Sequence, residues 1–402
     1  MISMICRLAT NDDKEAIRKI RVYAFEGRKN QYDPPKVAGT KPLVVYPLID
    51  YVVEEDNTIT AAIGVIDFSQ RIRGVWVRMA GISAVACKPE YRRKHHITKL
   101  LEFLFKDLDK KEYLVSSLYP FSYEFYERVG YAHVDSLEVY TVRCSDINQK
   151  PTPNRRIEED YDSEFARCQP LYQKMTAKID GLVKRPSNIW KDLLGWRWYE
   201  NGFQFICQDL EGNDLGYIII RFEQKSHQNK FPFIEVKEMV SFDPETKQAL
   251  LNFLANHDSQ RKHIQFAPLD SNYLLFMKNP DIKEKRSKTN SMFRILNIEK
   301  LLPKLNFPAD IAEEVCFTIS DPNCSWNNKT FELHIIKGKG QVMISQNDSN
   351  LLLTINSLSQ IIFGFYSVAE LAEVGKITGS PTEINKLSYI FPKQSATLRD
   401  YF

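Results

Sequence analysis

A basic turn is the part of this sequence best suited to bind a phosphate group. The stretch "AVACKPEYRRKHHITKLL" (84–101) passes from an apolar segment through a proline and the basic residues Arg92, Arg93 and Lys94 into an amphipathic pattern. A strand, a turn and a helix in this order bring unpaired backbone N–H groups and the positive end of a helix dipole to one place. A solvated basic loop has the same composition, but the position between a strand and a helix favours a phosphate or pyrophosphate site.

The elements that must position this turn follow from the spacing of apolar residues. In residues 1–150 the patterns predict three strands before the turn, a helix after it, then a strand, a short helix and a further strand from Tyr131. The predicted strands are 43–53, 60–68, 74–86 and 113–119, and the predicted helices are 11–28, 97–110 and 122–129. Polar, proline-containing residues 148–156 and charged residues 278–290 indicate two domain boundaries.

The segment between these boundaries repeats the plan of the first. "VACKPE" (85–90) and "VSFDPE" (240–245) each end a predicted strand before a helix. From Val85 to Leu100 there are 15 positions, and from Val240 to Leu250 only 10, so the second copy is five residues shorter. It also has Asp243 where the first copy has Lys88. We therefore expect one active site and one structural copy.

The remaining predicted elements complete the second copy and a third unit. The second copy contains a helical segment rich in aromatic residues at 189–200, strands at 203–207, 215–222, 233–242 and 263–267, and a helix at 246–257. The third unit begins with a strand that runs into a helix (293–305), continues with a hairpin (314–321 and 329–336) and ends in a helix-rich segment.

Composition excludes several classes of protein. The 402 residues are 43% hydrophobic and 26% charged, with a net charge of +3, as in ordinary soluble proteins of two or three domains. Net charge gives no reason to expect nucleic acid binding, and we find neither a signal peptide nor a membrane span. The seven cysteines are scattered without a CxxC pair, which indicates a reducing cytoplasm. The seven histidines lack zinc-site spacing, and we expect no metal.

The basic turn and the segment that follows it resemble the acetyl-CoA site of the GNAT acyltransferase superfamily. That family has a strand, then R-R-x-G-x, then a helix, and a later motif ending in F/Y-x-x-x-G-Y. "ISAVACKPEYRRKHHITKLL" and "SLYPFSYEFYERVGY" (117–131) stand in these places. One position departs from the pattern, because His95 replaces the glycine of the phosphate turn. His95 could crowd the pyrophosphate or donate a hydrogen bond to it, and a protein of this fold that has lost its cofactor is an alternative.

The resemblance extends over the whole chain, to the enhanced intracellular survival (Eis) acetyltransferases. The third unit contains "MFRILNIEKLL" and "ISDPNCSWNNKTFEL" (319–333), and the chain ends in "RDYF". The implied fold is α+β: two tandem GNAT-like α/β units with mixed sheets and flanking helices, followed by a sterol-carrier-protein-like α+β domain. The domains would be 1–150 (catalytic), 151–288 (degenerate) and 289–402 (sterol-carrier-like).

The resemblance also implies how acetyl-CoA is held. Backbone groups of a splayed strand would bind the pantetheine and polarise the thioester carbonyl, and amides of the turn would bind the pyrophosphate. The side chains of the basic turn would add charge, and two residues would line the far wall of the groove. The implied cofactor-binding residues are Val85, Ala86, Cys87, Arg92, Arg93, Lys94, His95, His96, Ile97, Thr98, Phe121 and Ser122. Cys87 could also be considered an acyl-carrying nucleophile, but it has no histidine motif beside it.

Two catalytic roles come from the same resemblance. Tyr126 in "FYERVGY" matches the family's general acid, and a phenol is well suited to protonate a departing thiolate. The terminal carboxylate, here on Phe402, would act as the base that receives the proton of the amine. Asp400 would add negative charge that attracts a cationic acceptor.

The sequence leaves the acceptor open. An aminoglycoside, a polyamine or a lysine side chain, free or in a protein, fits an N-acetyltransferase of this kind. A catalytically inert scaffold that binds an apolar ligand through its third domain is the alternative. By resemblance the protein would be a homo-oligomer, a homohexamer, in the cytoplasm.

Overall fold

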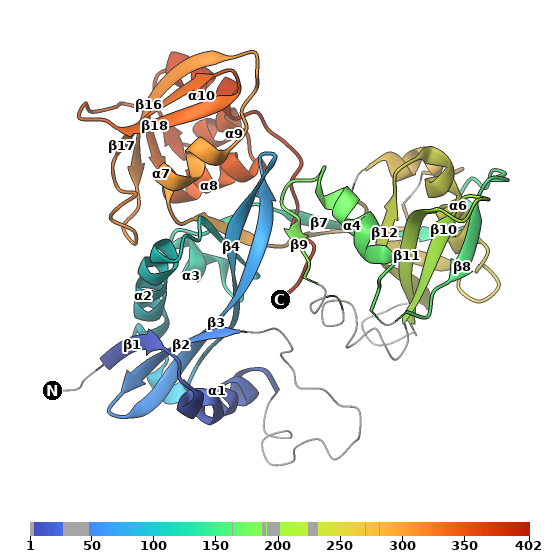
Figure 1. Ribbon diagram of the computed structural model, residues 1–402, viewed down its shortest axis with the longest axis horizontal. Coiled ribbons are helices and arrows are strands. Elements are labelled where there is room, and N and C mark those ends of the chain that lie inside the picture. Colours follow the sequence, from blue (N-terminus) through green and yellow to red (C-terminus); the bar gives the residue numbers. More distant parts are fainter. Residues whose placement is uncertain are drawn as a thin grey trace. The chain divides into compact units, whose positions relative to one another are not determined.

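The chain folds into two compact units. The computed structural model describes residues 4–26, 48–162, 164–186, 190, 202–223, 232–269, 271–280 and 282–402. The first unit comprises Met1–Asp135, Asp180–Val183 and Asn290–Phe402, and the second comprises Ser136–Ile179 and Lys184–Thr289 (Figure 1). The chain therefore passes between the units at four places. We describe each unit by itself.

The first unit is built on a mixed sheet in the order β1-β2-β3-β4-β5-β15-β6, with the short β9 paired to β3. Neighbouring strands are antiparallel except β4 and β5, which are parallel. The strands are β1 (Met4–Leu8), β2 (Ile49–Glu55), β3 (Thr58–Ile72), β4 (Val75–Cys87), β5 (Val115–Leu118), β6 (Ala132–His133), β9 (Val183–Lys184) and β15 (Met292–Ile295). The predicted strands and the helix after the basic turn are therefore confirmed within the described residues, and residues 43–47 of the first predicted strand lie outside them.

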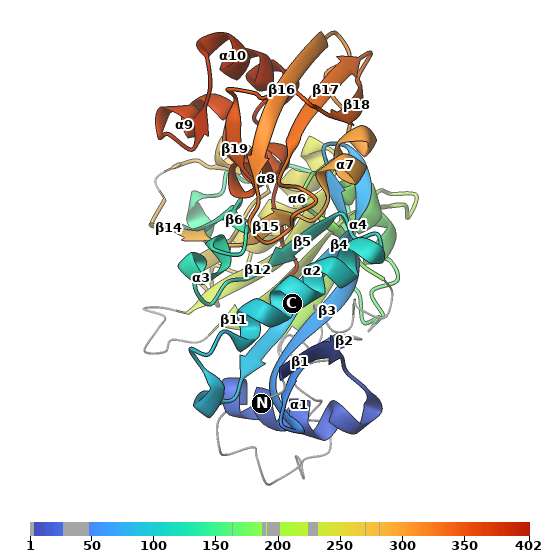
Figure 2. The same cartoon turned by 90° about the vertical axis from the view of Figure 1, so that its left-hand side faces the viewer.

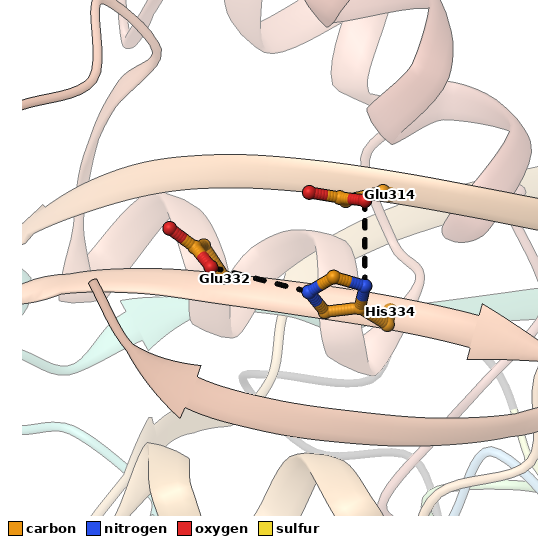
Figure 3. A group of neighbouring side chains, drawn as sticks. All are labelled: Glu314, Glu332 and His334. Carbon is orange, nitrogen blue, oxygen red and sulfur yellow. Dashed lines mark ion pairs between the residues drawn. The ribbon is translucent and has the colours of Figure 1, made fainter. Parts of the chain in front are cut away.

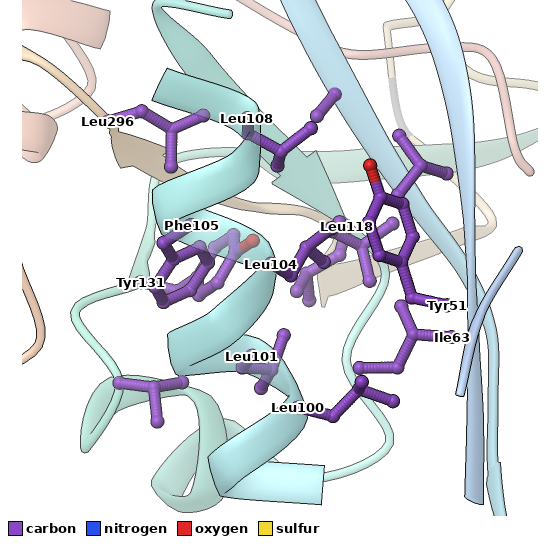
Figure 4. Close-up of a cluster of buried hydrophobic side chains, with 14 of the residues drawn as sticks. Tyr51, Ile63, Leu100, Leu101, Leu104, Phe105, Leu108, Leu118, Tyr131 and Leu296 are labelled. Carbon is purple, nitrogen blue, oxygen red and sulfur yellow. The ribbon is translucent and has the colours of Figure 1, made fainter. Parts of the chain in front are cut away.

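Helix α2 (His96–Lys110) packs its apolar face on this sheet because its leucines recur at helical spacing (Figure 4). Leu100, Leu101 and Leu104 are fully buried against strand residues such as Ile63 of β3. This packing fixes the start of α2 beside the end of β4. The predicted helix at 11–28 is divided into a 3₁₀ turn (Asn11–Asp13), α1 (Lys14–Arg21) and a π-helical turn (Val22–Glu26).

The sterol-carrier-like part of the first unit has its own sheet, in the order β18-β17-β16-β19-β20 (Figure 2). The predicted hairpin is confirmed, because β16 and β17 pair antiparallel. The elements are β16 (Ala312–Ser320), β17 (Thr330–Ile336), β18 (Lys339–Ile344), β19 (Leu352–Thr354), α8 (Ile355–Phe363), α9 (Val368–Glu373), β20 (Ile377–Thr378) and α10 (Pro381–Ile390). The side chains of Thr354, Ser367 and Ser380 cap the three helices.

Strand β15 differs from the predicted domain plan. The sequence assigns it to the third unit, whereas the structure inserts it between β5 and β6 of the first sheet. The fully buried Arg294 of β15 pairs with the fully buried Asp321 at 2.8 Å and donates to the carbonyl of Val129 at 2.6 Å. Gly130 lies so close to this guanidinium that a Cβ atom there would lie 1.4 Å from it. A buried ion pair thus joins the sterol-carrier-like part to the first sheet.

The second unit contains a sheet in the order β14-β7-β13-β12-β11-β10-β8. Its elements are β7 (Ser136–Arg143), β8 (Arg156–Glu159), α4 (Cys168–Thr176), β10 (Gly202–Gln208), β11 (Asp214–Glu223), β12 (Phe233–Ser241), α6 (Pro244–Ala255), β13 (His263–Phe266) and β14 (Glu284–Thr289). The structure differs from the two predicted domain boundaries. Strand β7 precedes the boundary at 148–156 and β14 lies within the boundary at 278–290, yet the two strands pair with each other. The predicted helix at 189–200 lies outside the described residues, except for Trp190.

Candidate active site

Strand β4 extends beyond its parallel neighbour and leaves an opening. The two strands pair from Met79 with Val115 to Ile82 with Leu118, where β5 ends. Residues 83–87 of β4 continue without a partner on that side among the described residues. Backbone N–H and C=O groups that face an opening must be satisfied by water or by a ligand. The predicted strand contacts, at Val85, Ala86 and Cys87, lie in this segment.

A bulge in β4 shapes the same segment. The register between β3 and β4 shifts between Ala62 and Gly64, and Ala84 has a φ of +49°. Arg21 of α1 donates to the carbonyl of Ala84 at 3.4 Å and forms an ion pair with Asp50. A helix thus supports the bulge from one side, which re-aims the residues that follow it. Sequence analysis did not indicate the bulge at Ala84, although this residue begins the motif 84–101, and Arg21 lies outside every motif.

Two residues of the basic turn have a left-handed backbone conformation. Arg93 and His95 have φ of +61° and +62°, in the left-handed region that favours glycine. His95 therefore adopts the conformation expected of the glycine that it replaces. Four consecutive side chains of the turn are exposed: Arg92, Arg93, Lys94 and His95.

Helix α2 begins with amides that no described side chain caps. The first hydrogen bond of the helix runs from the amide of Lys99 to the carbonyl of His95 at 3.0 Å. The amides of His96, Ile97 and Thr98 therefore precede the first helical hydrogen bond, as the first amides of any helix do. A phosphate can bind at such an end without displacing a side chain.

The His96 side chain takes no part in this end of the helix. It is 3% exposed, with Nδ1 2.7 Å from the Thr60 hydroxyl and Nε2 3.1 Å from a Glu55 carboxylate oxygen. Burial lowers the pKa of His96. His96 can therefore contribute its backbone amide, while its side chain fastens α2 to β2 and β3.

Tyr126 lies in α3 (Tyr123–Glu127), the short helix after β5, and the hydroxyls of its tyrosine neighbours are occupied. Tyr131 shares a hydrogen bond with Ser116 at 2.7 Å, and Tyr119 donates to the carbonyl of Asp400 at 2.7 Å. Within the described residues, the Tyr126 hydroxyl has no such protein partner. Tyr126 is 2% exposed, and burial raises its pKa, so the phenol stays protonated.

Phe121 and Ser122, which the sequence predicts to line the far wall of the groove, immediately precede α3. Ser122 caps α3 by accepting from the amide of Phe125 at 3.4 Å. Phe121 is 70% exposed and packs edge-on against Tyr126, with ring centroids 5.2 Å apart. An exposed aromatic ring beside a buried tyrosine can cover a ligand that reaches that tyrosine.

The C-terminal residues are docked against β4 and its neighbours. The Phe402 ring lies 5.1 Å from that of Phe68 and 5.5 Å from that of Tyr119. A Cβ atom on Gly81 would lie 3.0 Å from the Phe402 ring, so the glycine makes room for it. Gly81 precedes the free segment of β4 by two residues. Asp400 is 2% exposed, so its role in attracting an acceptor stays a prediction.

The sterol-carrier-like sheet carries a separate group of ionisable side chains. Glu314, Glu332 and His334 have ligand-type atoms within 4.8 Å of one another (Figure 3). The two ring nitrogens of His334 face different carboxylates, Nδ1 towards Glu314 at 3.4 Å and Nε2 towards Glu332 at 4.0 Å. The imidazole therefore bridges two acids on the strand surface, which is the geometry of an ion-pair network.

Three family models match successive parts of the chain. Residues 6–134 and 181–295 each match an acetyltransferase (GNAT) domain, and residues 298–399 match a sterol carrier protein domain. An uncharacterised N-acetyltransferase of Streptomyces griseus is 21% identical over 326 residues, which are 76% of this chain and 77% of the relative. None of the described helices is both long and apolar enough to cross a bilayer.

Solved structures share the fold over the whole chain. A GCN5-related N-acetyltransferase from Anabaena variabilis is 21% identical, with a TM-score of 0.86 and coverage of 100% of both chains. Eis1 from Mycobacterium abscessus is 16% identical, with a TM-score of 0.79 and the same coverage.

These matches define the chain as an acyltransferase of the GNAT superfamily, whose fold implies an acyl-CoA co-substrate. More particularly, the chain has two GNAT domains followed by a sterol carrier protein domain, and its fold is shared over the whole chain by Eis1.

Proposed function

We propose that the protein transfers an acetyl group from acetyl-CoA directly to a primary amine, in the first unit. The observation that carries this proposal is the docking of the C-terminus on β4, two residues before the segment of that strand that is left free. The acceptor class is an aminoglycoside, a polyamine or a lysine side chain. All three present an amine that must lose a proton as it attacks.

Two regions of the first unit, the end of β4 and the start of α2, would bind different parts of the cofactor. No described strand pairs with residues 83–87 on the side of β5, so this edge offers backbone groups to an extended, amide-containing chain such as pantetheine, apart from the carbonyls of Ala84 and Cys87, which accept from Arg21 and Arg92. The uncapped start of α2 offers amides to a pyrophosphate, and the exposed Arg92, Arg93 and Lys94 offer positive charge. His95 already adopts the left-handed conformation of the turn, so its presence in place of glycine does not prevent the turn from forming.

In the proposed reaction the amine nitrogen forms a bond to the thioester carbon, and the bond from that carbon to sulfur breaks. Backbone N–H groups at the end of β4 would polarise the carbonyl. Tyr126 would give its phenolic proton to the departing thiolate. Its hydroxyl is the suitable one because those of Tyr119 and Tyr131 are engaged by Asp400 and Ser116.

The proton released by the amine would go to the terminal carboxylate of Phe402. A free carboxylate has a pKa of about 3.5, so it is a weak base for an ammonium ion. Partial burial between aromatic rings would strengthen it, because burial disfavours the charged form of an acid. The rings of Phe68 and Tyr119 pack against the Phe402 ring and so hold the terminal residue beside β4.

A short Gly-Ser tail after Phe402 tests the proposal. The tail converts the terminal carboxylate into an amide and removes the base, while the aromatic side chains that dock the arm remain. We expect turnover to fall by at least ~10²-fold, the lower end for loss of a general base. The melting temperature and CoA binding should stay near those of the unmodified protein.

A tag of equal length at the N-terminus is the control and should leave turnover unchanged. Full activity of the tailed enzyme would remove the terminal carboxylate from the mechanism. Absence of any thermal shift with CoA would instead favour the inert scaffold, because a ligand that binds the folded state raises its melting temperature. Light scattering of the same preparation would test the proposed homohexamer.

A further inference from the structure

We propose that Asp135 is a positioning residue that latches the C-terminal arm, residues 396–402, and so places the terminal carboxylate. This inference rests on the proposed function, because it matters for catalysis only if that carboxylate takes part. It concerns a residue at which the chain leaves the first unit, four positions after the end of the motif 117–131 and outside it.

The Asp135 carboxylate accepts hydrogen bonds from three different groups. It receives the backbone amide of Leu398 at 2.9 Å, the hydroxyl of Thr397 at 3.2 Å and the side-chain amide of Asn290 at 3.1 Å. Asn290 also donates to the carbonyl of Leu398 at 2.8 Å, which closes the network around the arm. All three of these groups are donors, and an ionised carboxylate only accepts.

Asp135 is 1% exposed, which makes it an expensive choice for a merely structural contact. Burial raises its pKa, and the hydrogen bonds from Asn290, Leu398 and Thr397, with the positive charge of Arg399, oppose that rise. Tyr119, which also interacts electrostatically with Asp135, binds the next part of the arm through the carbonyl of Asp400. Asp135 and Tyr119 therefore bind neighbouring parts of the C-terminal arm.

The arm also contacts Asp180, the residue at which the chain returns to the first unit. The amide of Thr397 donates to the carbonyl of Asp180 at 3.0 Å, and Asp180 pairs with Ala396 as a parallel bridge. A Cβ atom on Gly181 would lie 2.5 Å from the amide nitrogen of Thr397, so only glycine allows this approach. Asp135, Asp180 and Asn290 each end or begin a segment of the first unit.

The latch is connected to the carboxylate by a short, packed length of chain. Leu398 is fully buried, Asp400 is held by Tyr119, and the Phe402 ring contacts Phe68 and the surface of Gly81. Four residues separate Leu398 from the terminus. Loosening at Leu398 therefore removes one of the contacts that hold the terminal residues, and a small displacement of a reacting group costs a large factor in rate.

Asp135→Asn tests the latch because it keeps the shape of the side chain and turns one acceptor into a donor. Amide hydrogen exchange of the peptide that covers residues 396–402 should speed up by about tenfold or more, as for the loss of one charge-assisted hydrogen bond. The kcat should fall by about the same factor, with the KM for acetyl-CoA unchanged. Asp13→Asn is the matched control, since Asp13 is also a buried acid of the first unit, paired with Arg7 instead of the arm.

Thr397→Val serves if Asp135→Asn does not fold, because it removes the hydroxyl from the arm itself and leaves the buried acid intact. We expect faster exchange of the arm and a lower kcat in this variant, by a smaller factor. Unchanged exchange of the arm in a folded Asp135→Asn protein, or in Thr397→Val, would overturn the latch. A loosened arm with full turnover would keep the anchoring contact but overturn both its role in positioning and the proposed role of the carboxylate. The Gly-Ser tail identifies failure of the proposed function separately, because it leaves the latch untouched.

Discussion

The turns after β4 and β12 occupy the same place in two similar units but differ at the start of the helix that follows. No described side chain caps α2, whereas Asp243 caps α6. Both strands have a register shift against their antiparallel neighbour, and both outrun a parallel partner, β5 or β13. After β4, eight residues precede α2; after β12, two residues precede α6. The two units therefore share the strand geometry and differ in the turn.

The start of the helix is where that difference has chemical consequences. In the second unit Asp243 caps α6 by accepting from the amide of Thr246 at 2.8 Å, and Arg155 pairs with the same carboxylate at 3.0 Å. This acid neutralises the end of the helix that a phosphate would need. In the second unit, apolar side chains of β7, β12, α6 and β13, such as Val236 and Ile264, line a cavity of about 10 Å³, roughly the space of one water. A duplicated unit can thus lose a cofactor site through one cap and a shorter turn.

Among the changes that compare the two units, Tyr126→Phe should have the largest effect on turnover. Loss of a general acid lowers turnover by about 10²–10⁴-fold. We expect that loss in kcat, with little change in the KM for acetyl-CoA, because the ring and its packing remain. The matched control is Tyr273→Phe in the second unit, where the hydroxyl is also buried. An equal loss from Tyr123→Phe would show that the acid is a different tyrosine of α3.

Replacing Arg92 and Arg93 by alanine should have the next largest effect. Each charge-assisted hydrogen bond is worth about 1.5–3 kcal/mol, so removing one should raise the KM for acetyl-CoA roughly tenfold to a hundredfold. The KM for the amine should stay nearly the same. Lys247→Ala, in the first turn of α6, is the corresponding change in the second unit and should alter neither constant. An unchanged KM in the double arginine variant would show that the turn does not bind phosphate.

Asp243→Ala should give the smallest effect. It tests the second unit, because it removes the cap of α6. Removing an N-cap costs about 0.5–2 kcal/mol, so the stability of the second unit should fall by that amount. The kinetic constants should not change. Calorimetry should still count one CoA per chain, because the turn before α6 remains shorter, with two residues against the eight before α2. Two CoA per chain, in this variant or in the unmodified protein, would contradict the assignment of a single site.

Much of this organisation could be predicted from local patterns. The leucines of α2 predicted its buried face, and the difference in spacing between Val85–Leu100 and Val240–Leu250 predicted that the two turns differ. His95 was recognised as occupying a glycine position, and its φ of +62° gives the physical reason. These features depend on residues close together in the sequence.

The parts that could not be predicted depend on contacts between distant residues. The charged segment at 278–290 indicated a linker, yet β14 within it pairs with β7, because an edge strand can carry many charges on its exposed face. Asp135 gave no local indication of its contact with Leu398, 263 positions away. Tyr126 was identified through resemblance, while the engaged hydroxyls of its neighbours became visible only in three dimensions.

The insertion of β15 between β5 and β6 also determines when the first unit can be completed during synthesis. Domains usually fold as units, the N-terminal one first, as the chain leaves the ribosome. Here the first sheet lacks an interior strand until residues 292–295 have been made, so it must wait for the whole second unit. A nascent chain of 150 residues would carry the basic turn and Tyr126 on an unfinished sheet. Acetyl transfer should therefore be absent until nearly the full chain has emerged.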